Sequence, residues 1–480
     1  MTYMKKIYWS LLLPAIVLTA CKKDFLRQQS ATAVNASTAI NTVNDLADAV
    51  NGMYTASKNS SLFGVNVPVL GDLLADNIFI SSSNYGQLTS DNNYTFIATS
   101  GEANGIWLQG YNTILQANRI IAAPIASTPT VDQLKGEAYA IRALTYLTLV
   151  NYFAKPNTIS PDADGVPIIT IPTYETGPYI KPARNSVKEV YDRVITDLDS
   201  AFLILPNTPI AANIHATNSN YISKYAAKAI EARAFLYRGD YANAQAAALL
   251  VVTQGGYTLT TTASAFKSFW TSATATDGKV ETIFELNNNT TGAVSGLADF
   301  FSQAGNGEML CTKELYDLYT PTDLRKGLIV NGIRKGNGQP AFLVNKYPNA
   351  SNPDKDEIKI IRYAEVLLTL AESYARTGDE TSARNYLNQL ATVRDPSFTG
   401  YVSSGQQLLD DIVNERRKEL AFEGLRLFDL YRLNQVIYRP AQPYSYPGYP
   451  EVSLTDIRRL QPIPQNEVDV NPNIKQNPGY

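Results

Sequence analysis

One helical unit with a glycine-aspartate turn occurs twice in this 480-residue chain. The segments EARAFLYRGDYANA and LAESYARTGDETSA place Gly239 and Asp240, and then Gly378 and Asp379, at identical spacing. Glycine supplies the unusual backbone dihedral that a tight turn needs, and small alanines let paired helices approach closely. Such units bury their apolar faces only by stacking on one another. The repeat therefore predicts a mostly helical scaffold of stacked hairpins.

Helical periodicity extends this scaffold beyond the two units. A first helix is predicted over residues 43–54, and a five-turn helix begins with Ser186 and Glu189 at the spacing of a capping box. Residues 105–121 and 132–153 are expected to form further helices, although they lack the glycine-aspartate turn. Together the helical pairs resemble tetratricopeptide repeats, which implies a tetratricopeptide-repeat-like frame.

Two long stretches between the helices have a different character. Residues 71–105 and 256–353 are rich in Asn, Ser, Thr and Gly and show no sustained helical period. Short strand-like runs such as residues 280–286 interrupt them. Long loops on a rigid frame are where binding usually resides. We expect both stretches to be ligand-binding inserts of one large domain.

The first 20 residues are expected to be a signal peptide. Lys5 and Lys6 precede the apolar, uncharged residues 7–20, which as a helix would span roughly 21 Å. That length is shorter than the ~30 Å hydrocarbon core of a membrane. The segment therefore has the properties of a secretory signal that is removed from the mature protein.

A lipid anchor is predicted at Cys21. Leu18-Thr19-Ala20-Cys21 resembles a bacterial lipobox, in which the cysteine is acylated and becomes the new N-terminus. More than one acyl chain makes such a tether stable, and Lys22 after the cysteine favours the outer over the inner membrane in this class of lipoprotein. The alternative is an ordinary secretory signal cleaved near a cysteine by chance. We expect a mature domain over residues 21–480, anchored to the cell outer membrane and exposed on the surface.

Composition excludes several chemistries. The 41 basic and 44 acidic residues nearly balance, which argues against nucleic acid as a partner. If Cys21 carries lipid, Cys311 is the one remaining cysteine, so neither a disulfide nor a multi-cysteine metal site is expected. The single histidine, His215, lies in a polar stretch predicted to be a solvated loop, which argues against a histidine-dependent hydrolase. No catalytic residue, metal ligand or cofactor is predicted.

Several motifs resemble the SusD/RagB family. NERRKELAFEGLRLFDLYRL, residues 414–433, is similar to the family's signature helix, and LQPIPQNEVDVNPNIKQNPGY, residues 460–480, is similar to its closing segment. GEAYAIRALTYLTLVNYFAKP, residues 136–156, is similar to an early helix of the family, and Trp107, assigned to the helical core, fits the helix before it. The resemblance covers both ends of the chain and is weakest over residues 256–353.

The charged residues of the signature segment permit two interpretations. Glutamates such as Glu415, Glu419 and Glu423 could serve as general acids or bases. They also alternate in sign with arginines along an otherwise apolar helix, with Gly424 permitting a turn. That pattern suits ion pairs that lock the last helix onto the repeats. A structural role is therefore predicted, in agreement with the scaffold role that the family resemblance implies.

The resemblance implies a function that periodicity alone does not. SusD-like proteins are surface lipoproteins that capture oligosaccharide or polysaccharide and pass it to a SusC-like TonB-dependent transporter, without a cofactor and without breaking a bond. Sugar binding in the family rests on aromatic rings, aided by polar side chains. Candidate glycan-binding residues in this chain are Asn84, Tyr85, Tyr94, Phe269 and Trp270. For each of them a place in the protein core is an equal alternative.

Three other functions stay open at this point. The same scaffold could bind a peptide or another nutrient. A glycoside hydrolase is disfavoured because no carboxylate pair is recognisable in a hydrolase context. A pure repeat scaffold is disfavoured by the long non-repetitive inserts.

Overall fold

The computed structural model describes residues 38–174, 180–208, 210, 219–272, 280–288, 296–350 and 356–480. The predicted signal peptide, Cys21 and His215 lie outside the described residues. Among those residues, none of the helices has both the length and the apolar character to cross a membrane.

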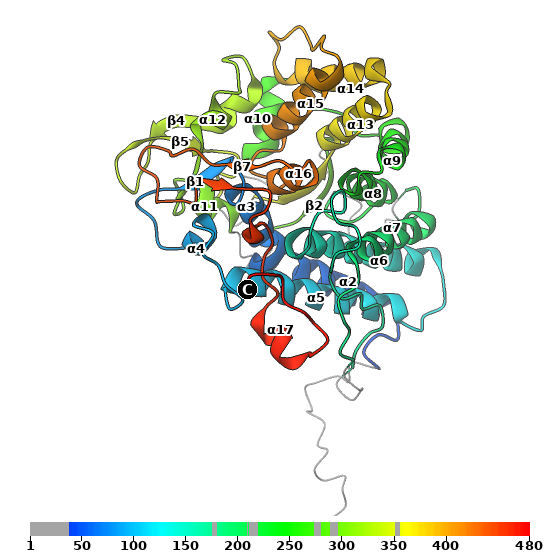
Figure 1. The fold of residues 1–480 in the computed structure, drawn as a ribbon. Coiled ribbons are helices and arrows are strands. Elements are labelled where there is room, and N and C mark those ends of the chain that lie inside the picture. The colour runs from blue at the N-terminus through cyan, green and yellow to red at the C-terminus, as the bar shows by residue number, and fades with distance from the viewer. Residues whose placement is uncertain are drawn as a thin grey trace, which may run out of the picture.

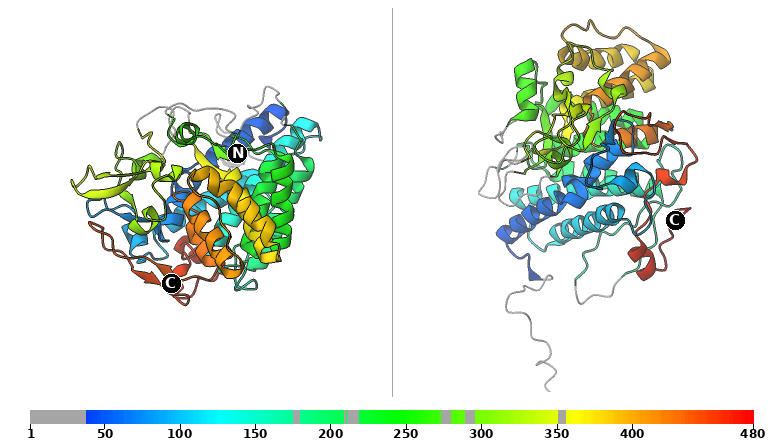
Figure 2. Two further views of the ribbon diagram at one scale, coloured as in Figure 1. Left: turned by 90° about the horizontal axis from the view of Figure 1, so that it is seen from above. Right: turned by 90° about the vertical axis from the view of Figure 1, so that its left-hand side faces the viewer.

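Helices form a continuous stack along one side of the molecule (Figure 1). Each helix contacts the next in chain order from α5 to α9, and α13 then packs on both α9 and α14. Figure 2 shows the same stack from above and from the side. The helices of the stack are α2 (Val43–Ser57), α5 (Gly101–Ala122), α6 (Pro129–Phe153), α7 (Val187–Ile204), α8 (Lys224–Arg238), α9 (Tyr241–Gln254), α13 (Tyr363–Thr377), α14 (Glu380–Arg394) and α15 (Gly405–Glu419). This mostly helical, repeat-like scaffold confirms the predicted fold class.

The two glycine-aspartate units are helical hairpins of matching geometry. Gly239 ends α8 with φ +83°, and Gly378 ends α13 with φ +95°. Asp240 and Asp379 then cap the following helices, each accepting a hydrogen bond from the backbone N–H three residues later. The capping box of Ser186 at the start of α7 is also present. These local predictions are confirmed.

Replacing Gly378 with alanine is expected to destabilise the second hairpin. No atom lies within 4 Å of the position where a Cβ would stand, so crowding does not contribute. The expected cost of about 1 kcal/mol comes from the left-handed backbone alone. Gly101, also in open space but at the start of α5, is the matched control, and Gly101→Ala should be neutral or stabilising. Urea unfolding of both variants measures the difference, and equal midpoints would contradict the prediction.

Short strands join the two predicted inserts on the other side of the molecule (Figure 1). An antiparallel sheet has the order β1-β3-β5-β4, in which β1 comes from the first insert and the other three strands from the second. Its strands are β1 (Ile78–Ile80), β3 (Met309–Cys311), β4 (Ile329–Ile333) and β5 (Pro340–Val344). Two further pairs are β2 (Thr282–Leu286) with β6 (Ile358–Arg362), and β7 (Ile437–Tyr438) with β8 (Glu451–Val452). The strand predicted within residues 280–286 is confirmed as β2.

Short helices also occur within the inserts and near the C-terminus, where no helix was predicted from periodicity. Elements of three to nine residues complete too few turns to produce a readable hydrophobic period. They are η4 (Ser60–Gly64), α3 (Asn66–Leu73), α4 (Thr89–Asn92), α10 (Ala263–Thr271), α11 (Leu297–Phe301), α12 (Lys313–Tyr316), η5 (Leu324–Leu328), α16 (Arg426–Arg432), η6 (Ile457–Arg459) and α17 (Gln465–Val470).

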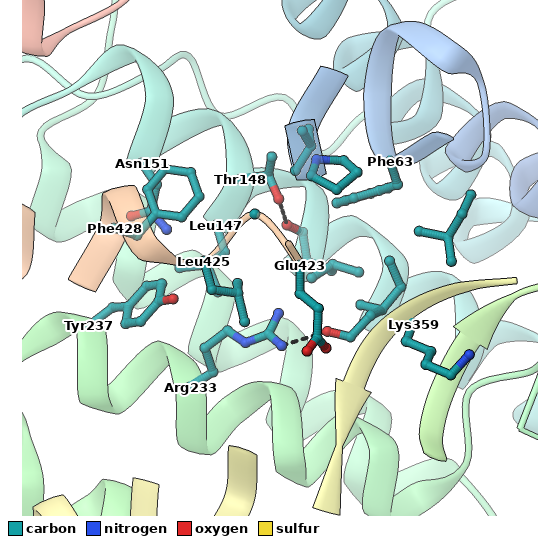
Figure 3. Close-up of a pocket in the computed structure, with 16 residues that line it drawn as sticks. Phe63, Leu147, Thr148, Asn151, Arg233, Tyr237, Lys359, Glu423, Leu425 and Phe428 are labelled. Carbon is teal, nitrogen blue, oxygen red and sulfur yellow. Dashed lines mark hydrogen bonds between the residues drawn. The ribbon is translucent and has the colours of Figure 1, made fainter. Parts of the chain in front are cut away.

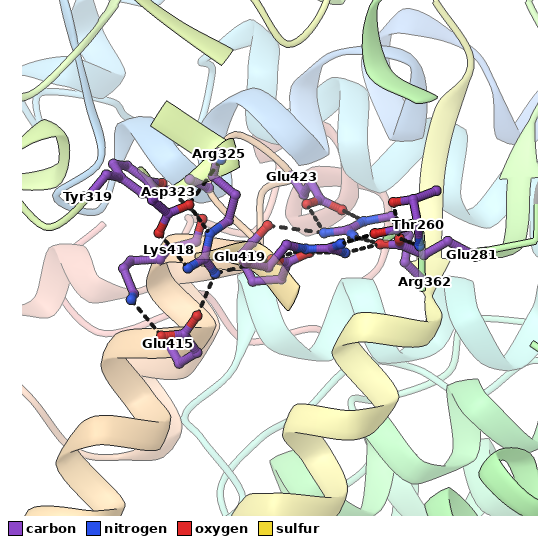
Figure 4. A network of polar contacts seen from close by, with 12 residues as sticks. Thr260, Glu281, Tyr319, Asp323, Arg325, Arg362, Glu415, Lys418, Glu419 and Glu423 are labelled. Carbon is purple, nitrogen blue, oxygen red and sulfur yellow. Dashed lines mark hydrogen bonds and ion pairs between the residues drawn. The ribbon is translucent and has the colours of Figure 1, made fainter. Parts of the chain in front are cut away.

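A buried network of charges fastens α15 to the rest of the molecule (Figure 4). The Glu419 carboxylate accepts hydrogen bonds from Arg362 at 2.9 Å, Arg394 at 3.1 Å and Arg325 at 3.2 Å. All four side chains are almost fully buried. Because these arginines come from β6, α14 and η5, the network ties the helical stack to the second insert. The predicted structural role of the signature glutamates is confirmed, and Gly424 turns the chain at φ +77°.

Candidate ligand-binding site

The loop that follows β1, residues 81–86, presents an exposed aromatic ring on a fixed backbone. Asn84 Nδ2 donates to Ser81 O at 2.8 Å, and Asn84 Oδ1 accepts from Gly86 N at the same distance. Tyr85 N donates to Glu308 Oε2 at 2.9 Å. Tyr85 itself is 74% exposed. Asn84 thus shapes the loop, while Tyr85 offers its ring to solvent.

The turn between β4 and β5 packs against this loop. Ser83 Oγ donates to Gly336 O at 3.1 Å, and Arg334 Nη2 donates to Ser83 O at 3.0 Å. Asn337 Nδ2 lies 3.4 Å from Ser82 Oγ. Sequence reasoning did not single out Arg334 or Asn337. The Asn337-Gly338 dipeptide was the available signal, because it is typical of a tight hairpin turn.

Opposite charges lie beneath the loop. Glu308 and Arg334 are both buried, and Glu308 Oε1 and Arg334 Nε lack hydrogen-bond partners within the described ranges. Burial raises the pKa of Glu308, and burial lowers the pKa of Arg334. The two charges are close together and of opposite sign. They therefore largely cancel, and this face carries no strong net electrostatic field. An exposed flat ring beside hydroxyl and amide groups can stack on the apolar face of a sugar while the polar groups bind its hydroxyls.

Tyr94, the third candidate, belongs to the core. It is 1% exposed, and its hydroxyl donates to Leu74 O. Its ring lies 5.7 Å from those of both Phe96 and Tyr449, measured between centroids, and Arg439 lies over it. A ring enclosed in this way has no free face for a sugar. Of the two interpretations of Tyr94, the structure shows the core one.

Trp270 is likewise enclosed, whereas Phe269 is half-buried. Lys346 Nζ lies 3.9 Å from the centre of the Trp270 ring, and Lys359 Nζ lies 4.8 Å from it. Phe269 packs edge-on against Trp270 at 5.1 Å and also has Lys359 over its ring. The structure therefore shows the core interpretation for Trp270. No contact in the described part of the chain links Phe269 or Trp270 to the Tyr85 loop.

An internal cavity lies where α6, α8, β6 and the turn after α15 meet (Figure 3). It has a volume of about 50 Å³, and its lining combines apolar residues with polar ones, which are Thr148, Asn151, Arg233, Tyr237, Lys359 and Glu423. Tyr237 Oη has no hydrogen-bond partner among the residues of known placement. A space of this size accommodates water but no oligosaccharide.

A larger cavity of about 440 Å³ lies between α5 and α17. Its walls are mostly apolar and include Trp107, Tyr111 and Ile169, with Glu467 as the one carboxylate of the lining. Trp107 is 2% exposed, which confirms its predicted place in the core. Burial raises the pKa of Glu467, so the site disfavours a charge there. Lys181 and Asn471 also belong to the lining, and Asn471 Nδ2 already donates to Pro182 O at 2.8 Å.

The acidic side chains of the signature segment and the Cys311 thiol are buried. No group of three or more His, Cys, Asp or Glu side chains in the described part of the chain could hold a metal ion. Burial opposes ionisation of Glu419, but the facing arginines hold its pKa well below the usual range. The pKa of Glu423 is also lowered, by Arg362 and Lys346 against the effect of burial. Burial raises the pKa of the Cys311 thiol well above its ordinary value. Buried, paired carboxylates and a buried thiol are unsuited to act on an external substrate.

Comparison with family models identifies two matching regions. Residues 333–480 match a model described as the SusD family. Residues 24–239 match a model described as "Starch-binding associating with outer membrane". The two matches lie on either side of most of the second insert.

Individual proteins of known sequence or structure are similar over nearly the whole chain. SusD-like protein P2 of Formosa agariphila is 25% identical over 92% of this chain and 93% of its own length. A crystal structure of a SusD superfamily protein from Bacteroides thetaiotaomicron has 27% identity and a TM-score of 0.80, covering 91% of this chain and all of that one. Another, from Bacteroides vulgatus, has 26% identity and the same TM-score, covering 92% of this chain and 99% of that one.

Proposed function

The chain belongs to the SusD/RagB family, and on this premise we propose that it captures oligosaccharide at the bacterial surface through the Tyr85 loop. The observation that carries the proposal is Tyr85 itself. Its ring is exposed, its backbone N–H is held by a hydrogen bond to Glu308, and the hydroxyl of Ser82 and the amide of Asn337 meet within the same loop region. Asn84 contributes by holding the loop in shape.

The proposed setting is the outer membrane. The description of one matching family model, starch-binding and associating with the outer membrane, supports both the ligand class and the location. A lipid anchor on Cys21 would keep the protein at the surface, and a SusC-like TonB-dependent transporter would receive the glycan. In this role the protein binds the glycan without cleaving it. No cofactor is required for this role.

The test of the proposal is a glycan panel on soluble protein that lacks residues 1–21. Calorimetry should give a dissociation constant in the range of about 1 μM to 1 mM for one polysaccharide class, with no shorter products. Tyr85→Ala should weaken that binding about tenfold, because loss of a stacked ring removes roughly 1.4 kcal/mol. Tyr85→Phe keeps the ring and should keep most of the affinity.

Three results would contradict the proposal. Shorter products would indicate a glycoside hydrolase instead. If the wild-type protein binds none of the plant, host and microbial glycans, the alternative of a peptide or another nutrient as ligand is favoured. Equal affinities of wild type and Tyr85→Ala would move the binding site away from this loop.

A further inference from the structure

Residues 438–450, a segment rich in tyrosine and proline, lie directly beside the Tyr85 loop. Ser82 N donates to Tyr444 O at 2.8 Å, and Tyr446 N donates to Ile80 O at 2.7 Å. Ser81 and Ser445 form an antiparallel bridge between these two bonds. Tyr444 is thus held next to the loop that presents Tyr85, although the two tyrosines are far apart in the sequence.

Tyr444 has two properties that its contribution to the fold does not explain. Its φ of +55° is left-handed, a conformation that costs free energy for a residue with a Cβ. It is also 50% exposed, and its hydroxyl and ring make no hydrogen bond or ring contact with the part of the chain that the structure describes. Its strained backbone is compensated by the hydrogen bonds of its neighbours, while the ring itself stays available.

A cavity of about 220 Å³ lies between β1 and residues 438–450, and its lining includes Ser445, the residue after Tyr444, but not Tyr444 itself. Its lining combines aromatic rings, such as those of Tyr446 and Tyr449, with the polar side chains of Gln442 and Ser445. Ser445 Oγ makes no hydrogen bond within the described ranges, so it can bind a ligand hydroxyl. Arg439, also in the lining, donates to Asn92 Oδ1 at 2.7 Å and is therefore already engaged.

We infer that Tyr444 is a second aromatic platform of the binding face, and that the ligand is an oligosaccharide long enough to contact both Tyr85 and Tyr444. This inference rests on the proposed function. Tyr85 stands three positions after Ser82, whose N–H donates to Tyr444 O, so the Cα atoms of Ser82 and Tyr85 lie no more than about 10 Å apart. Two rings at different positions on this face each stack on a sugar of their own, so one monosaccharide does not engage both. A chain of several sugars does, and its hydroxyls then meet Ser445, whereas Gln442 is already engaged with Lys313 N and the Glu314 carboxylate.

The test is affinity electrophoresis in gels containing starch, a xylan, a mannan or a β-glucan, followed by calorimetry with oligosaccharides of one to six units from the retaining polymer. Tyr444→Asn is the informative variant, because asparagine tolerates the left-handed backbone but lacks the ring. We expect its melting temperature to equal or exceed that of the wild type. We expect its affinity for the longest oligosaccharide to fall about fivefold to tenfold, with little change for the monosaccharide.

Tyr438→Ala is the matched control, since Tyr438 is an exposed tyrosine on β7 that makes no described contact with the Tyr85 loop. It should bind as the wild type does. Unchanged binding by Tyr444→Asn together with weakened binding by Tyr85→Ala would overturn the inference and leave the proposed function standing. An equal loss in Tyr438→Ala would also overturn it, because the effect would not be specific to Tyr444. Lack of retention of the wild type in every gel would overturn both.

Discussion

Glu419→Gln is expected to lower the free energy of unfolding by about 3 to 5 kcal/mol. The carboxylate of Glu419 faces three arginines, Arg325, Arg362 and Arg394, at distances of 2.9 to 3.2 Å. Glutamine keeps the shape of the side chain and removes its charge. Three almost fully buried guanidinium groups would then lose one of the negative charges that balance them. Water cannot compensate for this loss, because it does not reach the buried site.

The measurement is urea unfolding followed by circular dichroism, with Glu451→Gln as the control. Glu451 is an exposed glutamate on β8, and its substitution should change stability by no more than about 0.5 kcal/mol. The loss in Glu419→Gln should persist when sodium chloride is raised, because buried charges are screened little by salt. A second substitution, Arg394→Gln, should recover part of the loss, since the two residues interact directly. A loss as small as that of the control would show that the network contributes little.

Asp91→Asn is expected to stabilise the protein at pH 8 and to change its pH dependence. Asp91, in α4, is fully buried, and its Oδ1 has no hydrogen-bond partner within the described part of the molecule. Burial, with a smaller contribution from Glu102, raises the pKa of Asp91 from 3.8 to about 8. Between these values the folded state holds a proton that the unfolded state has released. Stability therefore falls as pH rises from about 4 to 8, by up to about 1.4 kcal/mol per pH unit from this one group.

Unfolding both proteins in urea between pH 4.5 and 8.5 tests this expectation. The stability of Asp91→Asn relative to the wild type should grow across the range and reach several kcal/mol at the top. Asp395→Asn provides a comparison in which the expected change in stability has the opposite sign. Burial raises the pKa of Asp395, but hydrogen bonds from Thr320, Thr322 and Ser397 outweigh it and lower that pKa to about 2. Asp395→Asn should therefore be less stable than the wild type above pH 4. A constant difference between Asp91→Asn and the wild type would exclude a raised pKa at Asp91.

The candidate site was predictable only in part. Residue type and a position in a polar insert selected Tyr85 and Trp270 equally, but only Tyr85 is exposed. Trp270 is covered by cations from distant positions in the chain, Lys346 and Lys359 among them. Tyr444 stands in a run of prolines and tyrosines that is typical of a loop, and nothing in the sequence distinguishes its ring from those of its neighbours. Its contact with Ser82 depends on how two remote segments fold against each other.

The helical hairpins were determined by the sequence itself. Gly239 and Asp240, like Gly378 and Asp379, specify the end of one helix and the start of the next through contacts within a few residues. Such local rules act before any tertiary contact forms and can be recognised in a linear pattern. The family signature likewise indicated where the buried charges would lie.

Tertiary structure alone decided which carboxylate meets which arginine and which aromatic ring remains in solvent. Glu419 pairs with residues of β6, α14 and η5, and β1 pairs with β3 across more than two hundred residues of chain. These partners are selected by packing of the whole domain, because burial makes an unpaired charge or an open polar group costly wherever it comes from in the sequence. Tyr85 and Tyr444 stay exposed because the packing of the whole domain leaves their rings uncovered. No local sequence rule specifies that outcome.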